Sequence, residues 1–215
     1  MARTDEAAKP DHENDVLRSH WVKPSGPAGY YWFLTFEHSV PLHSLVAESQ
    51  RSIELPYYDL VPLQALHLTL ERIAGPGEIS TEDLRETEAL AQENLRAIPP
   101  FDLHVGALRR VPSAIVFDIA PIARVNELRS GLRAATVQAS GPPVRTSNIE
   151  PHITLAYCNY DGPVPPKVVT AVAGLDRSKR TVSTRVVDAV MVLLQRGRTS
   201  YSWEPIARIP LAGDV

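Results

Sequence analysis

The sequence contains a single cysteine, Cys158, in 215 residues. One cysteine excludes an internal disulfide, and no spacing of cysteine and histidine resembles that of a zinc site. The chain also lacks any apolar run near the roughly 20 residues that span a bilayer. The stretch from Met1 to Asp15 is polar and charged, unlike a signal peptide. We therefore expect a reduced, cytoplasmic setting without membrane association.

An excess of charge of one sign is missing as well. The chain has 22 Lys and Arg residues against 25 Asp and Glu residues, for a net charge of −3. A protein that coats nucleic acid needs many phosphate contacts, so this balance argues against that class of protein. It is compatible with a local basic groove that contacts one or two phosphates. Hydrophobic residues make up 44% of the chain, as in ordinary globular proteins.

What the sequence does contain is a repeated tetrapeptide. Residues 67–70 read His-Leu-Thr-Leu and residues 152–155 read His-Ile-Thr-Leu, and the two histidines are 152 − 67 = 85 positions apart. Because strand side chains alternate between faces, each copy predicts a short strand with its aliphatic residues in a core. The histidine and the threonine of each copy then stand together on the other face of the strand.

The segments around these motifs repeat in kind. In the first series we expect a strand, an amphipathic helix, the motif strand, a helix and a strand over residues 30–36, 41–49, 66–70, 80–98 and 101–105. The second series gives the same order over residues 114–119, 121–138, 152–155, 167–173 and 185–195, with an added strand over 201–209. This is a repeat of pattern, with weak side-chain identity outside the motifs.

The repeat predicts how the chain is organised. Residues 1–28 are interpreted as a flexible tail and arm anchored by Trp21, and residues 29–215 as a single bilobal domain with repeat halves of about 30–112 and 113–210. Two similar lobes related by a pseudo-twofold axis would put the motif strands face to face across a groove. That arrangement would place His67 opposite His152.

Two facing imidazoles can divide the work of phosphodiester cleavage. A neutral imidazole takes a proton from attacking water, and a protonated one delivers a proton to the leaving oxygen, each worth about 10²–10⁴-fold in rate. The threonine hydroxyls can donate hydrogen bonds to the non-bridging phosphate oxygens. This chemistry requires no metal, and the sequence offers no carboxylate cluster that would hold one.

The paired motifs resemble those of the two-histidine (2H) phosphoesterase superfamily, and most closely its 2′-5′ RNA ligase-like branch. Within that branch the chain is similar to bacterial proteins with an N-terminal His-Trp arm, here residues 20–21. The resemblance covers nearly the whole chain from Trp21 onward. It implies an α+β fold of two pseudo-symmetric lobes, with antiparallel sheets lining a central cleft and helices outside.

The same resemblance implies an activity. The chain would hydrolyse 2′,3′-cyclic phosphate ends of RNA or nucleotides to 2′-phosphates, or run formally in reverse and join RNA ends by a 2′-5′ bond. Catalytic roles fall on His67 and His152, and phosphate-binding roles on Thr69 and Thr154. We expect no cofactor, no metal and a monomer. The substrate within this class, an RNA end, a cyclic nucleotide or an ADP-ribose cyclic phosphate, is left open.

The motifs also allow a structural role, a zinc site or a binding module as interpretations. A single strand histidine is more often structural or merely solvated, but its repetition at equivalent positions argues against that interpretation. Zinc binding by the pair would need a third ligand. The main alternative is a module that binds a nucleotide or RNA end in the same cleft without turnover. We favour an enzyme because both histidines and both threonines are intact.

Two residues that follow the motifs are assigned by alternation. Tyr157 lies three positions after Thr154, which puts it on the opposite face of a regular strand. A bend near Cys158 would bring it to the cleft rim to stack on a base, and we include it among the substrate-binding residues. Arg72, five positions after His67, is expected to point away from the motif face.

Features of the turns and loops complete the predicted site. Arginines in two predicted hairpin turns are usually solvated, but turns at the cleft mouth would let them contact a polynucleotide backbone; they are Arg109, Arg110, Arg196 and Arg198. Substrate specificity is expected to lie in the loops around residues 55–65 and 141–149.

Overall fold

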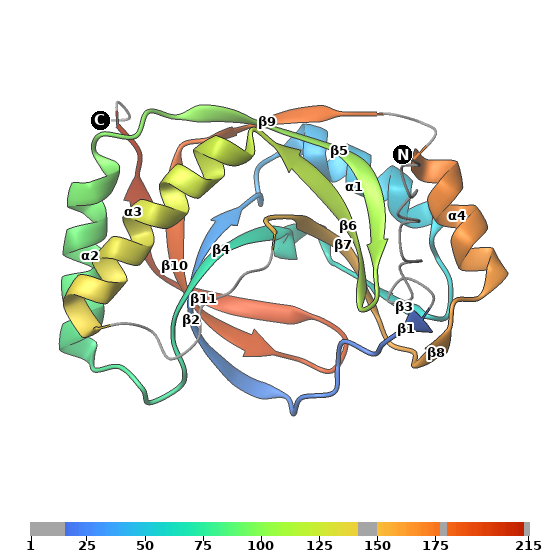
Figure 1. The fold of residues 1–215 in the computed structure, drawn as a ribbon, viewed down its shortest axis with the longest axis horizontal. Coiled ribbons are helices and arrows are strands. Elements are labelled where there is room, and N and C mark those ends of the chain that lie inside the picture. The colour runs from blue at the N-terminus through green and yellow to red at the C-terminus, as the bar shows by residue number, and fades with distance from the viewer. Residues whose placement is uncertain (1–15, 142–149, 177–179, 213–215) are drawn as a thin grey trace, which may run out of the picture.

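The computed structural model describes residues 16–141, 150–176 and 180–212, and these form an α+β structure (Figure 1). The helices are α1 (Val40–Ser52), α2 (Thr81–Leu95), α3 (Ile122–Ser140) and α4 (Pro166–Asp176), with a 3₁₀ turn, η2 (Leu63–Ala65). The strands are β1 (Val16–Leu17), β2 (Gly26–Thr35), β3 (Tyr58–Leu60), β4 (His67–Ala74), β5 (Phe101–Val111), β6 (Ala114–Ala120), β7 (Ile153–Cys158), β8 (Gly162–Pro163), β9 (Val182–Val186), β10 (Asp188–Arg196) and β11 (Tyr201–Pro210).

One continuous sheet runs through both lobes. Its strand order is β11-β10-β2-β4-β7-β6-β5-β9, with β3 added on β7, and every pairing between neighbours is antiparallel. The sheet curls, and helices α2 and α3 lie against its first lobe while α1 and α4 lie against its second (Figure 1). The predicted α+β fold with antiparallel strands and outer helices is therefore confirmed.

The two sequence halves interlock across the lobes. Strands β2 and β4 of the first half join β10 and β11 of the second half in the first lobe, through the pairing of β2 with β10. Strand β5 of the first half pairs with β6 and β9 of the second half in the other lobe. The helices cross over too, since α3 packs on β4 and α1 packs on β7 and β9. Each lobe is thus built from both halves of the repeat.

Two predicted elements differ in the structure. The single strand expected over residues 185–195 divides at Val187, because β9 pairs with β5 in the second lobe while β10 pairs with β2 in the first. A loop was expected between Pro56 and Pro62, yet its middle forms β3, which pairs with β7. In both places the strand is set by a distant partner, which local sequence does not specify.

Local signals account for the other elements. Helix α2 begins with a capping box, in which the Ser80 hydroxyl accepts from the Asp83 amide and the Asp83 carboxylate accepts from the Ser80 amide. Apolar residues on the inner faces of the helices pack against β4 and β7, where Leu68 and Ile153 are both fully buried. No helix within the described ranges is both long and apolar enough to cross a membrane.

The described part of the N-terminal arm begins at Val16. Strand β1 pairs with β8, and the His20 backbone N–H donates to the Cys158 carbonyl at 2.8 Å. Trp21 is half-buried and its indole N–H donates to the Asp59 carboxylate at 2.8 Å, so it anchors the arm beside β3. Of the predicted flexible tail and arm over residues 1–28, residues 1–15 lie outside the described residues.

Candidate active site

The two motif strands are direct neighbours in the sheet. Leu68 of β4 and Ile153 of β7 are paired, and this is the only registered pair between these strands within the described residues. In an antiparallel pair, this register puts His67 beside Thr154 and Thr69 beside His152. The motifs were expected to face one another across a groove. Instead they stand side by side on one face of the curled sheet, hereafter the motif face.

This register sets the spacing of the four side chains. Residues directly opposite in an antiparallel pair have Cβ atoms about 4.5–5.5 Å apart, and diagonal neighbours about 7–8 Å apart. The two histidines are diagonal neighbours and so project from the same face of the sheet. The two rings also interact electrostatically, because a positive charge on His152 lowers the pKa of His67.

Both imidazoles are oriented by the same local hydrogen bond. His67 Nδ1 lies 2.9 Å from the Ala65 carbonyl oxygen, and His152 Nδ1 lies 2.8 Å from the Glu150 carbonyl oxygen. A carbonyl only accepts, so each Nδ1 must carry a proton. Each Nε2 is then the nitrogen that accepts a proton when the ring is neutral and donates one when the ring is charged.

His67 is held in an aromatic setting. Its ring stacks on Phe33 with centroids 4.4 Å apart and an interplanar angle of 17°, and meets the Trp203 ring edge-on at 5.1 Å. Phe33 belongs to a small apolar cluster with Val190 that is separate from the main core. Burial lowers the pKa of His67 to about 4. The imidazole is therefore neutral at neutral pH in the free protein.

His152 lies among charges instead. The Arg109 guanidinium contacts the Asp118 carboxylate at 2.5 Å and the Glu150 carboxylate at 3.1 Å. Burial lowers the pKa of His152 most strongly and Arg109 lowers it further, while the two carboxylates oppose them. The Glu150 carbonyl, through its hydrogen bond, also favours the charged ring. The two histidines thus share a backbone geometry but differ in surroundings.

The two threonines also differ. Thr69 is exposed on the motif face, whereas Thr154 is only 7% exposed. A phosphate at this face would therefore meet one exposed hydroxyl and one that is nearly buried.

A β-bulge at the last residue of each motif changes the face of the residues that follow. The register shifts at Leu70 in β4, where Thr69 pairs with Phe33 but Glu71 pairs with Trp32. An equivalent shift occurs at Leu155 in β7. The extra residue returns position 72 and position 157 to the motif face.

The bulges correct the alternation argument. Arg72 was expected to point away from the motif face, and this is wrong, because it pairs with Tyr31 in the same phase as Thr69 and His67. The Arg72 guanidinium contacts the Glu78 carboxylate at 3.1 Å. Tyr157 is rephased in the same way, by the bulge at Leu155 and not by the expected bend near Cys158. A bulge is invisible without the partner strand, so no sequence signal reveals it.

Tyr157 does not offer a free ring face. Its side chain is 6% exposed, and the His20 ring of the arm stacks on it with centroids 4.2 Å apart and an interplanar angle of 29°. The Trp21 and Tyr201 rings meet it edge-on at 5.2 and 5.4 Å.

Of the four arginines predicted to lie in turns, Arg109 and Arg110 lie instead within β5, and Arg196 is the last residue of β10. Arg109 lies on the motif face beside His152, whereas Arg110 is half-buried next to it and Arg198 is exposed. Arg196 packs its guanidinium over the Trp21 and Tyr201 rings, at 5.8 and 5.0 Å from their centroids, and donates to the His20 carbonyl. It therefore holds the arm.

Sequence reasoning missed the residues that surround the imidazoles. Phe33 and Trp203 enclose His67, and Asp118 with Glu150 acts on His152. The aromatic run over residues 30–36 carried one signal, since apolar residues on both faces of a strand indicate that both faces are covered. Of the two loops expected to set specificity, residues 142–149 lie outside the described residues, and the other contains β3 and η2.

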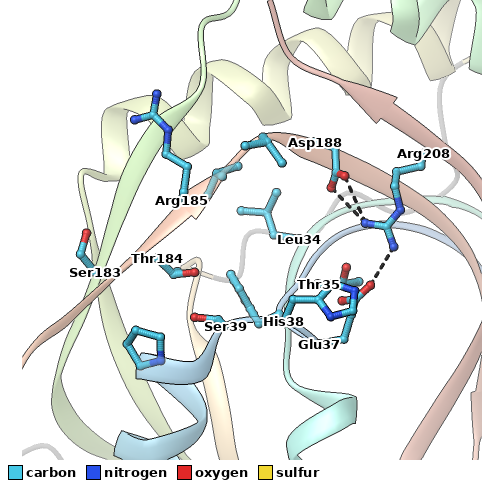
Figure 2. Close-up of a pocket in the computed structure, with 14 residues that line it drawn as sticks. Leu34, Thr35, Glu37, His38, Ser39, Ser183, Thr184, Arg185, Asp188 and Arg208 are labelled. Carbon is cyan, nitrogen blue, oxygen red and sulfur yellow. Dashed lines mark hydrogen bonds and ion pairs between the residues drawn. The ribbon is translucent and has the colours of Figure 1, made fainter. Parts of the chain in front are cut away.

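A pocket of about 380 Å³ lies next to the motif strands, at the end of β2 (Figure 2). Leu34, Thr35 and Phe36 line one wall, and residues of β9 and the start of β10 line the other. Thr35 is the cross-strand partner of His67. The four motif side chains themselves are not among the described residues that line it.

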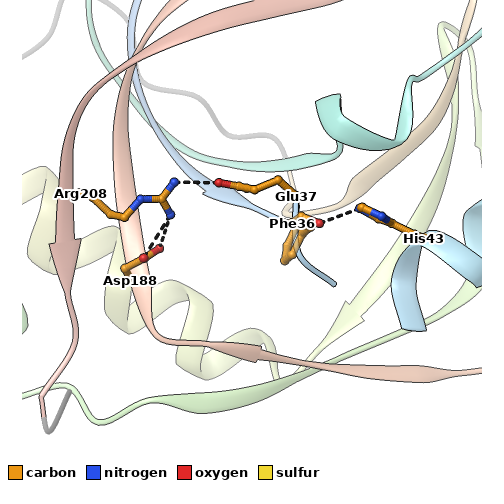
Figure 3. A network of polar contacts seen from close by, with 5 residues as sticks. All are labelled: Phe36, Glu37, His43, Asp188 and Arg208. Atoms are coloured by element: carbon orange, nitrogen blue, oxygen red, sulfur yellow. Dashed lines mark hydrogen bonds and ion pairs between the residues drawn. The ribbon is translucent and has the colours of Figure 1, made fainter. Parts of the chain in front are cut away.

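Arg208 fastens one wall of this pocket. Its guanidinium contacts the Glu37 carboxylate at 2.7 Å and the Asp188 carboxylate at 3.1 Å, which ties β11 to β10 and to the end of β2 (Figure 3). His43 Nε2 lies 2.8 Å from the Phe36 carbonyl oxygen and holds the turn into α1. Among described residues, no three His, Cys, Asp or Glu side chains gather in a way that would hold a metal ion.

A curled antiparallel sheet with paired His-x-Thr motifs on one face defines the two-histidine phosphoesterase fold. Comparison of sequences also assigns the chain to a family. It belongs to the 2′-5′ RNA ligase superfamily, whose family model matches residues 41–198. No curated protein matches the chain.

Solved structures share the fold at low sequence identity. TT0787 of Thermus thermophilus is 19% identical with a TM-score of 0.64, over 86% of this chain and 99% of that one. LigT of E. coli in its apo form is 18% identical with a TM-score of 0.60, over 87% of this chain and 99% of that one. LigT has also been crystallised in complex with 3′-AMP, ATP and NADP+.

Proposed function

We propose that this chain is a metal-independent phosphodiesterase that hydrolyses 2′,3′-cyclic phosphate ends of RNA or nucleotides to 2′-phosphates. The observation that carries the proposal is the pairing of β4 with β7, which sets two histidines and two threonines on one face of the sheet. Both Nδ1 atoms are occupied by carbonyls, which leaves both Nε2 atoms to exchange protons. Membership of the 2′-5′ RNA ligase superfamily supports the same class of chemistry.

In the proposed reaction the two imidazoles act in opposite senses. Nε2 of the neutral ring takes a proton from water as its oxygen attacks phosphorus. The bond between phosphorus and the 3′ oxygen breaks, and that oxygen takes the proton from Nε2 of the charged ring. The product carries a 2′-phosphate and a 3′-hydroxyl. With a 5′-hydroxyl in place of water as the nucleophile, the same step would give a 2′-5′ linkage and a free 3′-hydroxyl.

The threonines act on the phosphate itself in this proposal. Thr69 and Thr154 donate hydrogen bonds to non-bridging oxygens and hold phosphorus between the two rings. Their donors are in place before charge develops in the transition state, where they contribute most. The nucleotide complexes of LigT, which has the same fold, support a nucleotide as the ligand of this face.

The test is turnover of 2′,3′-cyclic mononucleotides, cyclic-phosphate-ended RNA and ADP-ribose cyclic phosphate, with the product phosphate located by NMR. We expect 2′-phosphate from at least one substrate, in the presence of EDTA. His67→Ala and His152→Ala should each lower kcat/KM by about 10²–10⁴-fold, since each removes one proton transfer. His104→Ala, at an exposed histidine of β5, serves as the matched control.

Two results would contradict the proposal. Wild-type rates in both His67→Ala and His152→Ala would show that the imidazoles take no part in the reaction. Binding of 3′-AMP without product from any substrate would instead identify a nucleotide-binding module that uses the same face, the alternative that the motifs leave open.

A further inference from the structure

The two bulges return one residue after each motif to the motif face, and these two residues lie toward opposite ends of it. Strands β4 and β7 are antiparallel and run away from their junction in opposite directions. Arg72 therefore lies beyond Thr69 at one end of the face, and Tyr157 lies beyond Thr154 at the other. The pseudo-twofold relation of the motifs thus places two very different side chains at equivalent positions.

The Tyr157 end of the motif face is covered by other parts of the chain. The His20 ring stacks on the Tyr157 ring, and the Trp21 and Tyr201 rings meet it edge-on. These contacts leave the Tyr157 side chain only 6% exposed. This end of the face therefore serves to hold the arm.

The Arg72 end presents a partly exposed guanidinium. Arg72 Nη2 lies 3.1 Å from Glu78 Oε2, and the Arg72 side chain is 20% exposed. The same Glu78 oxygen accepts from the Gly75 backbone N–H at 2.5 Å, which fixes the carboxylate to the turn after β4. A guanidinium has five N–H donors, and the contacts of Arg72 with the described residues use one of them. Glu78 thus sets the direction of the guanidinium and leaves donors for a ligand.

The spacing along β4 suits two phosphates of one nucleotide. Arg72 pairs with Tyr31, and Thr69 pairs with Phe33, two positions along β2. The backbone of Arg72 is therefore about 7 Å along the strand from that of Thr69. The phosphates on the 3′ and 5′ sides of one ribose are separated by a similar distance. A guanidinium binds phosphate oxygens through two parallel hydrogen bonds, a geometry that an ammonium does not reproduce.

The geometry points to Arg72 as the residue that binds a second phosphate, on the 5′ oxygen of the ribose that carries the cyclic phosphate. This inference rests on the proposed function and narrows its substrate class to a ribose that is phosphorylated at its 5′ oxygen as well. The last nucleotide of an RNA has that phosphate, and so does ADP-ribose cyclic phosphate. A nucleoside 2′,3′-cyclic phosphate lacks it.

Two mononucleotides that differ only in the 5′ phosphate test the inference: adenosine 2′,3′-cyclic phosphate and its 5′-phosphorylated form. In the wild-type protein the 5′ phosphate should raise kcat/KM by about 10-fold or more. Arg72→Gln should reduce this ratio to less than about 2, because its amide cannot form the charged bidentate contact. Arg72→Lys, which keeps the charge and loses the planar fork, should retain part of the ratio. Arg51→Ala, at an exposed arginine of α1, is the matched control and should keep the wild-type ratio.

A cyclic-phosphate-ended dinucleotide and ADP-ribose cyclic phosphate distinguish the two sources of the 5′ phosphate. The substrate with the higher kcat/KM identifies the source, and Arg72→Gln should remove its advantage over adenosine 2′,3′-cyclic phosphate. For the dinucleotide, the plot of log kcat/KM against log salt should also become shallower by about 0.7 in this variant, the value for one phosphate contact on a single strand.

Two outcomes would overturn the inference: equal kcat/KM of the wild-type protein for the two mononucleotides, or a wild-type ratio in Arg72→Gln. If no substrate is turned over, calorimetry compares the dissociation constants of 3′-AMP and adenosine 3′,5′-bisphosphate. Tighter binding of the bisphosphate that is lost in Arg72→Gln would uphold the role of Arg72 while the proposed catalysis fails. Equal affinities for the two ligands would overturn the inference as well.

Discussion

The two imidazoles share a hydrogen bond and differ in what surrounds their rings. His67 sits against Phe33 and Trp203, and His152 beside the Arg109 guanidinium. In both cases burial lowers the pKa below the ordinary 6.5, to about 4 for His67. A charged ring is therefore scarce at neutral pH in the free protein, and the proposed acid would be charged mainly at lower pH.

This has a consequence for the pH profile of the proposed reaction. The base must be neutral and the acid charged for the reaction to proceed. The pH dependence of kcat/KM reports the pKa values of the free protein, so we expect the midpoints of both its acid and its alkaline limb to lie below pH 6.5. A bound phosphate anion favours charged imidazoles and raises their pKa. We therefore expect the alkaline limb of kcat at higher pH than that of kcat/KM, measured between about pH 4 and 9 with a cyclic mononucleotide.

A Trp203→Ala variant provides the control for the pH profile. It opens one side of the His67 ring to water, so the pKa of His67 should rise toward its ordinary value and move one limb upward. The limb that reports His152 should stay in place. An alkaline limb of kcat/KM above about pH 7 in the wild-type protein would contradict the assignment of neutral, buried imidazoles.

Strand alternation was enough to predict the faces of the motif residues. Leu68 and Ile153 are in the core, and His67 and Thr69 share the opposite face, as the pattern indicated. The same rule failed at Arg72, because a bulge adds a residue that no local pattern reveals. The surroundings that set the pKa of each histidine come from distant strands, and so lay beyond sequence reasoning too.

At the scale of elements, β4 and α3 meet at a buried charge. The bulge directs Glu71 away from the motif face, where it is 1% exposed and its carboxylate lies 3.9 Å from the Arg129 guanidinium of α3. Burial raises the pKa of Glu71, although Arg133 and Arg129 oppose it. The charged form is thus less favourable in the folded protein than in the unfolded chain.

The raised pKa of Glu71 predicts how replacing its carboxylate with a neutral amide changes the stability of the protein. A carboxyl with a raised folded pKa contributes its full stability below the unfolded value of 4.5 and loses it as pH rises through the folded value. Glu71→Gln should therefore raise the free energy of unfolding at pH 7 by about 1–2 kcal/mol relative to wild type. The gain should shrink near about pH 4, as measured by urea denaturation at both values.

The matched comparison for this site is Glu71→Ala, which removes the same charge but leaves a cavity under α3. It should destabilise the protein at both pH values, by about 1–3 kcal/mol. A Glu71→Gln variant that is less stable than wild type at neutral pH would show instead that the contact with Arg129 outweighs the cost of burying the charge.

Local signals located most elements but could not assign their partners. The capped start of α2 at Ser80 and the strands β5, β6 and β11 follow from caps, prolines and alternation. The β-branched run after Val182 gave no sign that it divides at Val187 to serve two lobes. Such a division depends on pairing with β5 on one side and β2 on the other, which are contacts over long distances in sequence.

At the scale of the whole molecule, neither sequence half holds a complete lobe. The first half supplies β5 to the second lobe, and the second half supplies β10, β11 and α3 to the first. We therefore keep the proposal that residues 29–215 form a single domain. Its two lobes should fold and unfold together, because removing either half leaves open strand edges and uncovered apolar faces in both lobes.

Expression of residues 1–112 and 113–215 as separate chains tests this. Neither piece should show a cooperative thermal transition, and the intact chain should show one transition that coincides by far-UV circular dichroism and tryptophan fluorescence. Co-expression of the two pieces is the control, since it restores every pairing. A piece that melts cooperatively by itself, or two separated transitions in the intact chain, would argue for two independent units.

The single registered pair between β4 and β7 bears on which changes in chain length this protein tolerates. Leu68 and Ile153 fix that junction because both are fully buried. A deletion of one residue in either motif would exchange the two faces of its strand and would place a histidine and a threonine in the hydrophobic core. Surface loops can change length during evolution, whereas the two motifs at residues 67–70 and 152–155 cannot gain or lose a residue.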